Sequence, residues 1–129
     1  LKPEGDPVEE LRRYITRKIE MSAKRPEASR LFANEILHGA PAIKGFLTTS
    51  LKKLVDEKAA VIRQWVSEGR LAPIDPYHLI FMIWATTQHY ADFDVQVRAV
   101  LGPQVDKPGF AEQSAQAVLS LILNGIKVR

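Results

Sequence analysis

The stretch YHLIFMIWATTQHYADF, from Tyr77 to Phe93, decides how this chain folds. Drawn as a helix it is apolar on two opposite sides, whereas a surface helix of a globular protein has one apolar stripe. The first side carries Tyr77, Phe81, Trp84, Gln88, Ala91 and Val95. The second side carries Leu79, Met82, Ile83, Thr86, Tyr90, Phe93 and Val97. We therefore expect one side to face the core of the domain and the other to face a second copy of the chain.

Helix start and stop signals divide the rest of the chain, and no strand-like alternation persists anywhere. Asp6 followed by Pro7 predicts a capped helix start, with Glu9 at the capping-box position. Asp75-Pro76 predicts a second start of the same kind, and Gly39 is a natural C-terminal cap. The predicted helices span about residues 7–24, 26–38, 41–68, 76–101 and 108–126.

The predicted architecture is therefore an all-α bundle of five helices. The last two helices are too apolar to be covered within one copy, so we expect two copies to pair them as an intermolecular four-helix bundle around a two-fold axis. The alternative is that this apolar surplus fills a tight monomeric core. The residues predicted for dimerisation are Thr86, Tyr90, Phe93, Val97, Ala115, Val118, Leu119 and Ile122.

Length and composition limit the possible functions of the chain. Its 129 residues form one domain, and they are enough to bury a core without disulfides or metals. The absence of cysteine excludes disulfides, thiolate catalysis and cysteine-ligated metal sites, and it fits a cytoplasmic protein. The net charge of +3 comes from basic pairs scattered among acids, which favours solvated helix faces over a nucleic-acid footprint. The longest apolar run, Leu79 to Ala85, is too short for a membrane span, so we expect no membrane partner.

Candidates for catalysis or metal binding are few. His89 and Asp92 are three residues apart and could pair on a helix, but no activated nucleophile lies nearby in the sequence. His78, His89, Asp92 and Asp94 form a weak metal-ligand pattern compared with motifs such as H-E-x-x-H. We therefore expect no catalytic residue, no metal ion and no cofactor.

The pair Trp84 and Gln88 is the sharper signal. A spacing of four places both side chains on one helix face, with Phe81 on the same face and Tyr77 beyond it. An indole offers a flat stacking surface, and a glutamine amide offers a donor and an acceptor side by side. The combination suits a planar ligand with adjacent C=O and N–H groups, such as a pyrimidine. Periodicity alone fits ordinary core packing as well, with the Gln88 amide bonded to a neighbouring backbone group.

Two segments resemble the regulatory domain of TetR-family transcription regulators. They are EASRLFANEILHGAPAIKGF, residues 27–46, and VIRQWVSEGRLAPIDPYHLIFMIWATTQHYADF, residues 61–93. In that family a long helix ends in a glycine-containing turn, here Glu68-Gly69-Arg70, and an Asp-Pro, here Asp75-Pro76, opens the penultimate helix. The resemblance covers essentially the whole chain, and it is strongest to members that respond to uracil and thymine.

The resemblance implies a single ligand-binding and dimerisation domain over residues 1–129, with residues 1–6 as the remnant of a linker. Such regulators bind operator DNA through an N-terminal helix-turn-helix domain, which we do not find in this chain. We therefore expect a C-terminal fragment that does not bind operator DNA by itself. The expected partners are a second copy of the chain and a small-molecule effector, uracil or thymine.

The resemblance also implies a ligand pocket inside each unit, and it suggests which residues line it. Trp84 would stack or edge-pack on the ring, and Gln88 would read the imide edge. The further walls would be Phe32 and either Glu35 or Ile36 on the second helix, Phe46 and Leu47 on the long helix, and Phe81 beside Trp84. In the intact regulator, the ligand would favour a conformation that releases operator DNA.

Two other functions remain open from the sequence. The same fold could sense a different small molecule, either lipophilic or cationic, and Glu35 is the only candidate carboxylate for a cation. The chain could instead be a purely structural helical dimerisation module that binds no ligand.

Overall fold

The computed structural model describes all residues from Leu1 to Arg129, and it is entirely helical apart from turns and short connecting loops. The helices are α1 (Pro7–Lys24), α2 (Pro26–Leu37), α3 (Lys44–Phe46), α4 (Lys52–Ser67), α5 (Pro76–Asp92), α6 (Asp94–Leu101) and α7 (Phe110–Ile126). A π-helical turn, Leu47–Leu51, joins α3 to α4, and a 3-10 turn, Gly102–Asp106, follows α6. This architecture confirms the predicted all-α class, although the five predicted helices are divided into seven.

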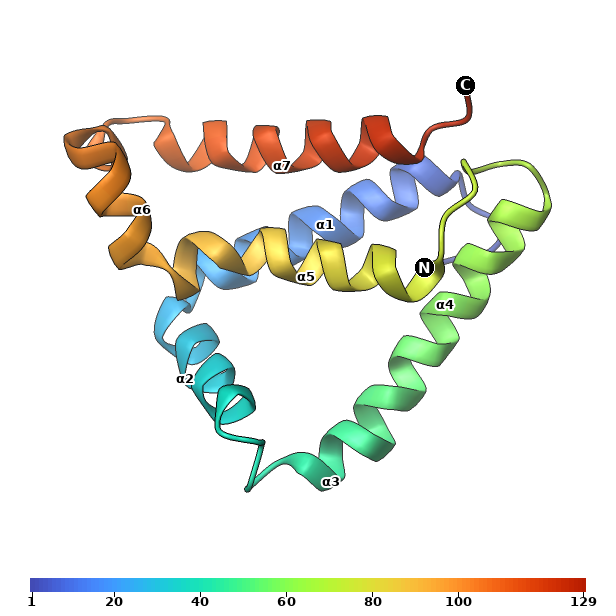
Figure 1. Ribbon diagram of the computed structural model, residues 1–129. Helices are drawn as coiled ribbons and strands as arrows, with labels where there is room; N and C mark the ends of the chain where they lie inside the picture. The colour runs from blue at the N-terminus through green and yellow to red at the C-terminus, as the bar shows by residue number, and fades with distance from the viewer.

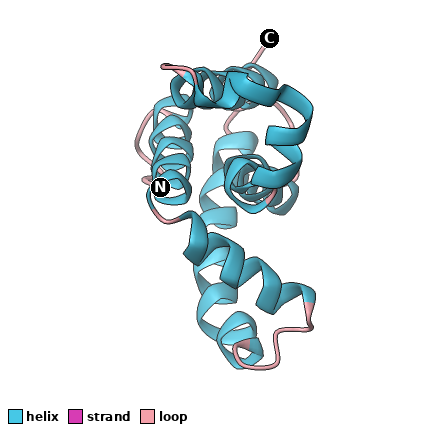
Figure 2. Cartoon of the chain, turned by 90° about the vertical axis from the view of Figure 1, so that its left-hand side faces the viewer, coloured by secondary structure: helices cyan, strands magenta, loops and turns pink.

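Two groups of helices form the molecule (Figure 1). Helices α1, α5 and α7 lie side by side in one group, and α1 packs against both of the others. Helices α2 and α4 slope away from the two ends of α5 and are joined through α3, so that α2, α3, α4 and α5 outline a triangle. Figure 2 shows the same division from the side, with the α2–α3 end projecting from the rest.

The predicted helix starts at Pro7 and Pro76 are present, and their caps explain them. The long helix predicted from Pro41 begins instead at Lys44 and is interrupted by the π-helical turn. The Asp6 carboxylate accepts a hydrogen bond from the Glu9 amide at 3.0 Å, and Pro7 occupies the first turn, as predicted. The Glu9 side chain accepts from the Arg12 guanidinium at 3.3 Å and so does not close the predicted capping box. The Asp75 carboxylate accepts from the amides of Tyr77 and His78 and caps α5.

The penultimate helix differs from its prediction, which ran unbroken to about Leu101. It ends at Asp92, and α6 starts afresh at Asp94. Phe93 has φ −116° and ψ 33°, which lies outside the helical range and turns the chain. No proline or glycine marks this break, so the sequence carries no local signal for it. The last helix starts at Phe110 rather than near Pro108, because Gly109 has a positive φ of 87°.

The core lies between α1, α4, α5 and α7. Trp65, Leu11, Ile15, Ile62 and Ile83 are completely buried. The Trp65 indole N–H donates to the Pro3 carbonyl at 2.9 Å, which fastens the N-terminal segment to α4. Helix α2 has no buried residue, so the triangle's far corner contributes little to this core. No helix has both the length and the apolar character needed to cross a membrane.

Candidate functional site

Trp84 lies on the face of α5 between α1 and α4, next to Tyr14 of α1. The indole N–H of Trp84 donates a hydrogen bond to the Tyr14 hydroxyl at 3.0 Å. Phe81, one turn earlier on α5, has its ring centroid 5.9 Å from that of Trp84 at an angle of 54°. Trp84 and Phe81, both predicted ligand residues, are therefore brought together. Trp84 is half-buried, so part of its ring stays accessible.

Two lysines stand over the ring of Tyr14. The ammonium nitrogen of Lys18, on α1, lies 5.6 Å from the ring centroid, and that of Lys58, on α4, lies 5.7 Å from it. A cation over an aromatic face at this distance is attracted by the ring's quadrupole. Burial, and after it the charge of Lys58, hold the pKa of the Lys18 ammonium below its usual value. Burial also raises the pKa of the Tyr14 hydroxyl, and the bond from Trp84 opposes that rise.

Gln88 lies one turn beyond Trp84 on α5 and is half-buried. Its amide forms no hydrogen bond within the chain, unlike the hydroxyls of Thr86 and Thr87, which bond to the α5 backbone. The alternative in which a neighbouring backbone group satisfies Gln88 is thus not what the structure contains. No polar side-chain atom of the chain is both buried and unpartnered, so the Gln88 amide reaches solvent and is free to bond with a ligand.

Contacts between helices hold α5 in place at both ends of the site. The Tyr77 hydroxyl donates to the Asp56 carboxylate at 2.7 Å, which ties the start of α5 to α4. The Ser29 hydroxyl donates to the Asp92 carboxylate at 2.6 Å, which ties the end of α5 to α2. These bonds fix the two legs of the triangle against the helix that carries Trp84 and Gln88.

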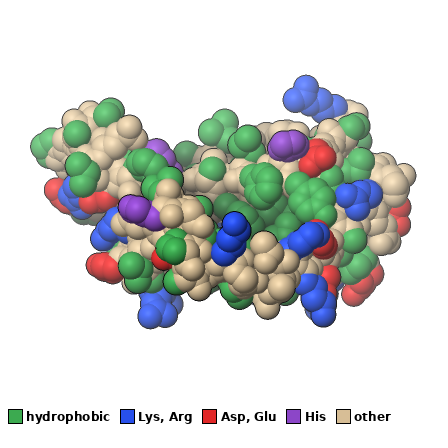
Figure 3. Space-filling view, turned by 60° about the horizontal axis from the view of Figure 1, so that its bottom comes forward, with side chains coloured by type: hydrophobic (Ala, Val, Ile, Leu, Met, Phe, Trp, Pro, Cys, Tyr) green, Lys and Arg blue, Asp and Glu red, His purple; other side chains and the backbone are tan.

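The remaining predicted ligand residues lie toward the far corner of the triangle. Phe32 and Ile36 on α2 are 42% and 39% exposed, and Phe46 on α3 is 50% exposed. Leu47, at the start of the π turn, is half-buried. Neither Phe32 nor Phe46 stacks with another ring, so the structure does not join these residues to Trp84 directly. Figure 3, with the α3 corner turned forward, shows a hollow floored by hydrophobic side chains with basic side chains at its edge.

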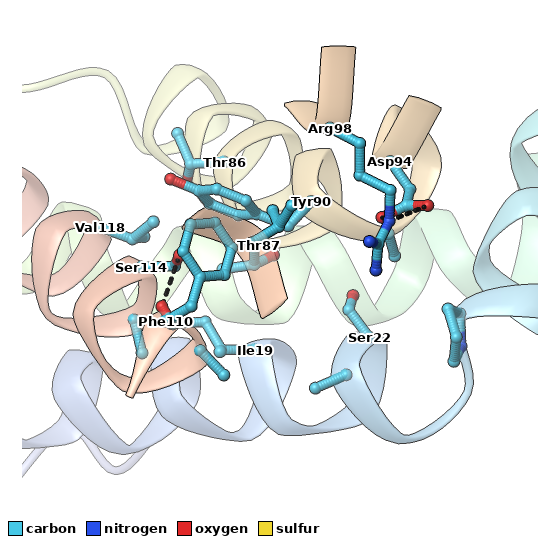
Figure 4. A pocket seen from close by; sticks show the side chains of 16 residues that line it. Ile19, Ser22, Thr86, Thr87, Tyr90, Asp94, Arg98, Phe110, Ser114 and Val118 are labelled. Carbon is cyan, nitrogen blue, oxygen red and sulfur yellow. Dashed lines mark hydrogen bonds and ion pairs between the residues drawn. The ribbon is translucent and has the colours of Figure 1, made fainter. Parts of the chain in front are cut away.

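A separate cavity of about 320 Å³ lies between α1, α5, α6 and α7 (Figure 4). Most of its walls are apolar, with the hydroxyls of Ser22, Thr87 and Ser114 among them. Arg98 at one side is held by Asp94 at 3.1 Å and Asp106 at 3.0 Å, so its charge is already paired. None of the predicted ligand residues lines this cavity. Thr86, Tyr90, Ala115 and Val118, which were predicted for dimerisation, do line it.

The predicted dimerisation residues divide between the protomer core and its surface. Val118 and Leu119 are buried in the core, and Ile122 packs against it, because α7 lies along α1. Ala115, Val97 and Thr86 are half-buried. Tyr90 and Phe93 are 38% and 53% exposed. The apolar side chains left most open on these helices are others, including Met82, Val95, Val100 and Leu121.

The polar side chains that the sequence offered for catalysis, metal binding or a cationic ligand make other contacts in the structure. His89 stacks on Phe93, with ring centroids 5.1 Å apart, while Asp92 is bonded to Ser29, so His89 and Asp92 do not form the pair considered from the sequence. No group of three His, Asp or Glu side chains could hold a metal ion. The Glu35 carboxylate accepts from the Ala42 amide at 2.7 Å and fastens the loop after α2.

Sequence reasoning missed Tyr14, Lys18 and Lys58. Tyr14 and Lys18 are four apart and share one face of α1, which is a detectable signal, but nothing in the sequence aims that face at Trp84. Lys58 reaches the same ring from α4. The three residues come together only through the packing of α1 and α4 around α5.

The all-α fold is that of the C-terminal region of a TetR-type regulator. The whole chain, residues 1–129, matches the family described as the C-terminal region of YcdC-like proteins, and it belongs to that family. It is 51% identical over 123 residues to the HTH-type transcriptional regulator RutR of Escherichia coli O157:H7, of Escherichia coli strain K12 and of Shigella flexneri. The match covers 95% of this chain and 58% of each relative, so the chain spans little more than half the length of those proteins. These relatives are transcription regulators and not enzymes.

Proposed function

We propose that this chain is the effector-sensing and dimerisation domain of a cytoplasmic transcription regulator, and that its effector is a pyrimidine dione, uracil or thymine. The observation that carries the proposal is the Gln88 amide, which lies one turn from the Trp84 indole and has no partner in the protein. The resemblance to regulators that respond to uracil and thymine supports the same ligand.

The proposed binding mode uses the two side chains differently. The pyrimidine ring packs on the accessible part of the Trp84 indole, whose N–H is already committed to Tyr14. The Gln88 amide then donates to a ring carbonyl and accepts from the adjacent ring N–H. At the edge between its two carbonyls uracil presents a carbonyl and an N–H, whereas cytosine presents an amino group and an unprotonated ring nitrogen there, so cytosine forms neither bond with the amide in this orientation.

The proposed response couples this site to DNA-binding domains in the intact regulator. Tyr14 joins the ligand's helix, α5, to α1, and α1 is the helix at the N-terminal end of this domain. A ligand that favours one packing of α1 on α5 would therefore favour one placement of the preceding domains. Ligand and operator would then oppose each other by a coupling free energy of about 1–3 kcal/mol.

We also propose that the domain forms a homodimer through the outer faces of α5, α6 and α7. Met82 is 59% exposed, Phe93 53% and Leu121 78%, although all three are large apolar side chains. Apolar patches of this kind mark contact surfaces on small domains. Val118 and Leu119 contribute to this surface only indirectly, because they support α7 from within the protomer.

Calorimetric titration of uracil into the chain and into its Gln88→Leu variant tests the proposed ligand site. We expect the wild type to bind uracil and the variant to keep its fold but to lose at least tenfold in affinity, because an amide that reads the imide edge is worth about 1.4 kcal/mol or more. The control is Gln96→Leu on α6, whose side chain is exposed. Equal affinity in wild type and Gln88→Leu would exclude the proposed role of Gln88.

A second candidate function follows from the cavity between α1, α5, α6 and α7. Its volume of about 320 Å³ and its largely apolar walls suit a small lipophilic effector rather than a planar polar one. Substitution of Ala111→Phe at its wall would fill it. Loss of effector binding in that variant, with binding intact in Gln88→Leu, would favour this alternative.

A further inference from the structure

Lys18 and Lys58 both lie against the ring of Tyr14, one from α1 and the other from α4. Both ammonium groups lie within 6 Å of the Tyr14 ring centroid, at 5.6 and 5.7 Å, and both side chains are half-buried. Neither lysine forms an ion pair with any of the chain's carboxylates. Asp56, the acid two residues before Lys58, is held by Lys52 and by the Tyr77 hydroxyl.

This arrangement is unfavourable for the protein alone. Two like charges that share a partly desolvated space repel each other more strongly than they would in water. Burial, and after it the charge of Lys58, lowers the pKa of the Lys18 ammonium. The Tyr14 ring attracts each cation but does not reduce the repulsion between them. An anion held by both ammonium groups would relieve it.

The lysines stand beside the proposed effector site. Both ammonium groups lie over the ring of Tyr14, and the Tyr14 hydroxyl accepts the hydrogen bond from Trp84. Helices α1 and α5 lie side by side and run in the same direction (Figure 1), so Lys18 follows Tyr14 by one turn as Gln88 follows Trp84. The Tyr14 hydroxyl uses an acceptor position for Trp84 and keeps its own hydrogen for another acceptor.

We propose that Lys18, Lys58 and the Tyr14 hydroxyl form an anion-binding edge of the effector site, so that the site binds a cyclic imide preferentially as its anion. This inference rests on the proposed function, because it adds a charge requirement to the ring that Trp84 and Gln88 hold. On ionisation the ring N–H bond breaks, its proton passes to solvent, and the electron pair is shared with the two flanking carbonyl oxygens. The Gln88 amide, which accepts from that N–H in the neutral ring, turns over and donates its own N–H to the ring nitrogen of the anion. Those oxygens then accept hydrogen bonds from the lysines and from Tyr14.

The test compares uracil with azauracil, in which one ring C–H is replaced by nitrogen. The two rings have nearly the same shape, but azauracil is the stronger acid. Titrations of the whole chain at a pH between the acid constants of the two compounds therefore offer a neutral and an anionic ligand of equal size. We expect azauracil to bind about tenfold more tightly or better, and the double variant Lys18→Gln, Lys58→Gln to remove most of that preference. Lys53→Gln, on the exposed side of α4, is the matched control and should keep the preference.

The possible results separate this inference from the proposed function. Equal binding of both compounds by the wild type, or an azauracil preference that survives in the double variant, would overturn the inference and leave the pyrimidine site intact. Failure of both compounds to bind, with wild-type helicity by circular dichroism, would overturn the proposed function and the inference with it. A preference that is present in the wild type and in Lys53→Gln, and is lost in the double variant, would support both.

Discussion

The indole N–H of Trp84 donates to the hydroxyl of Tyr14 at 3.0 Å, across a separation of 70 residues in the chain. This bond joins the helix that carries the proposed ligand residues to the helix nearest the N-terminus of the domain. Tyr14 therefore lies beside the proposed ligand residues and ties α5 to α1.

Replacing Tyr14 with phenylalanine should destabilise the domain. The variant keeps the ring under Lys18 and Lys58 but removes the acceptor of the Trp84 N–H, at a cost of about 1 kcal/mol in the free energy of unfolding. Urea denaturation measures the change. Tyr90→Phe is the control, because the Tyr90 hydroxyl has no hydrogen-bond partner in the chain and its side chain is 38% exposed. Equal losses in the two variants would contradict the role given to the Tyr14–Trp84 bond.

Replacing Ile83 with alanine should lower the free energy of unfolding far more than Tyr14→Phe does. Ile83 is completely buried where α5 meets the core, so the variant loses apolar burial and leaves a cavity, for about 2–5 kcal/mol in all. Val95→Ala on α6 should change the free energy of unfolding by less than about 0.5 kcal/mol, since Val95 is 83% exposed. A small effect at Ile83 would mean that α5 is not packed as described.

Asp75 should contribute to stability in a pH-dependent way. The amides of His78 and then Tyr77 hold the pKa of the Asp75 carboxyl below its usual value of 3.8. Because the folded pKa is lowered, the stabilisation is present above the unfolded pKa and is lost as the pH falls through the folded one. Asp75→Ala should therefore lower the melting temperature at neutral pH, and the difference from wild type should narrow in acid. Asp75→Asn keeps a capping oxygen but cannot ionise. The contribution of its cap to the melting temperature should therefore change little over the same pH range. If the melting temperature of the wild type exceeded that of Asp75→Ala by the same amount down to strong acid, the ionised Asp75 carboxylate would not be the stabilising cap.

The proposed dimer face can be tested with a single charge. Leu121 is 78% exposed on α7, so Leu121→Glu should leave the protomer folded but break the dimer, because a charge would be buried at the centre of the contact. Light scattering coupled to size exclusion gives the mass of each species. Asn124→Glu, near the end of the same helix and also exposed, is the control for added charge. A dimer that survives Leu121→Glu at micromolar concentration would place the contact elsewhere.

The sequence was informative where a single residue decides the local backbone. Asp6-Pro7 and Asp75-Pro76 start helices as predicted, and Gly39 and Gly69, both with positive φ, end them. The break at Phe93 was missed because no proline or glycine marks it. The π turn at Leu47–Leu51 contains no such residue either.

Contacts between helices were harder to predict than the helices themselves. Trp84 and Gln88 could be placed on one face by their spacing, but the rotation of α1 and α4 that adds Tyr14, Lys18 and Lys58 is set by the whole core. The same limit affected the dimer prediction. Val118 and Leu119 fall on the apolar stripe of α7, and periodicity does not reveal that α1 of the same protomer covers them.

Thermal unfolding of the chain with and without uracil tests the central claim most directly, with cytosine as the matched compound. Uracil at a hundred times its dissociation constant should stabilise the folded state by about 2.7 kcal/mol, which raises the melting temperature by several degrees. Cytosine should give a smaller rise, because its amino group and unprotonated ring nitrogen reverse the donor and acceptor pattern that the Gln88 amide reads in uracil. Equal shifts with the two compounds, or no shift with uracil at millimolar concentration in a folded sample, would contradict a pyrimidine dione site at Trp84 and Gln88.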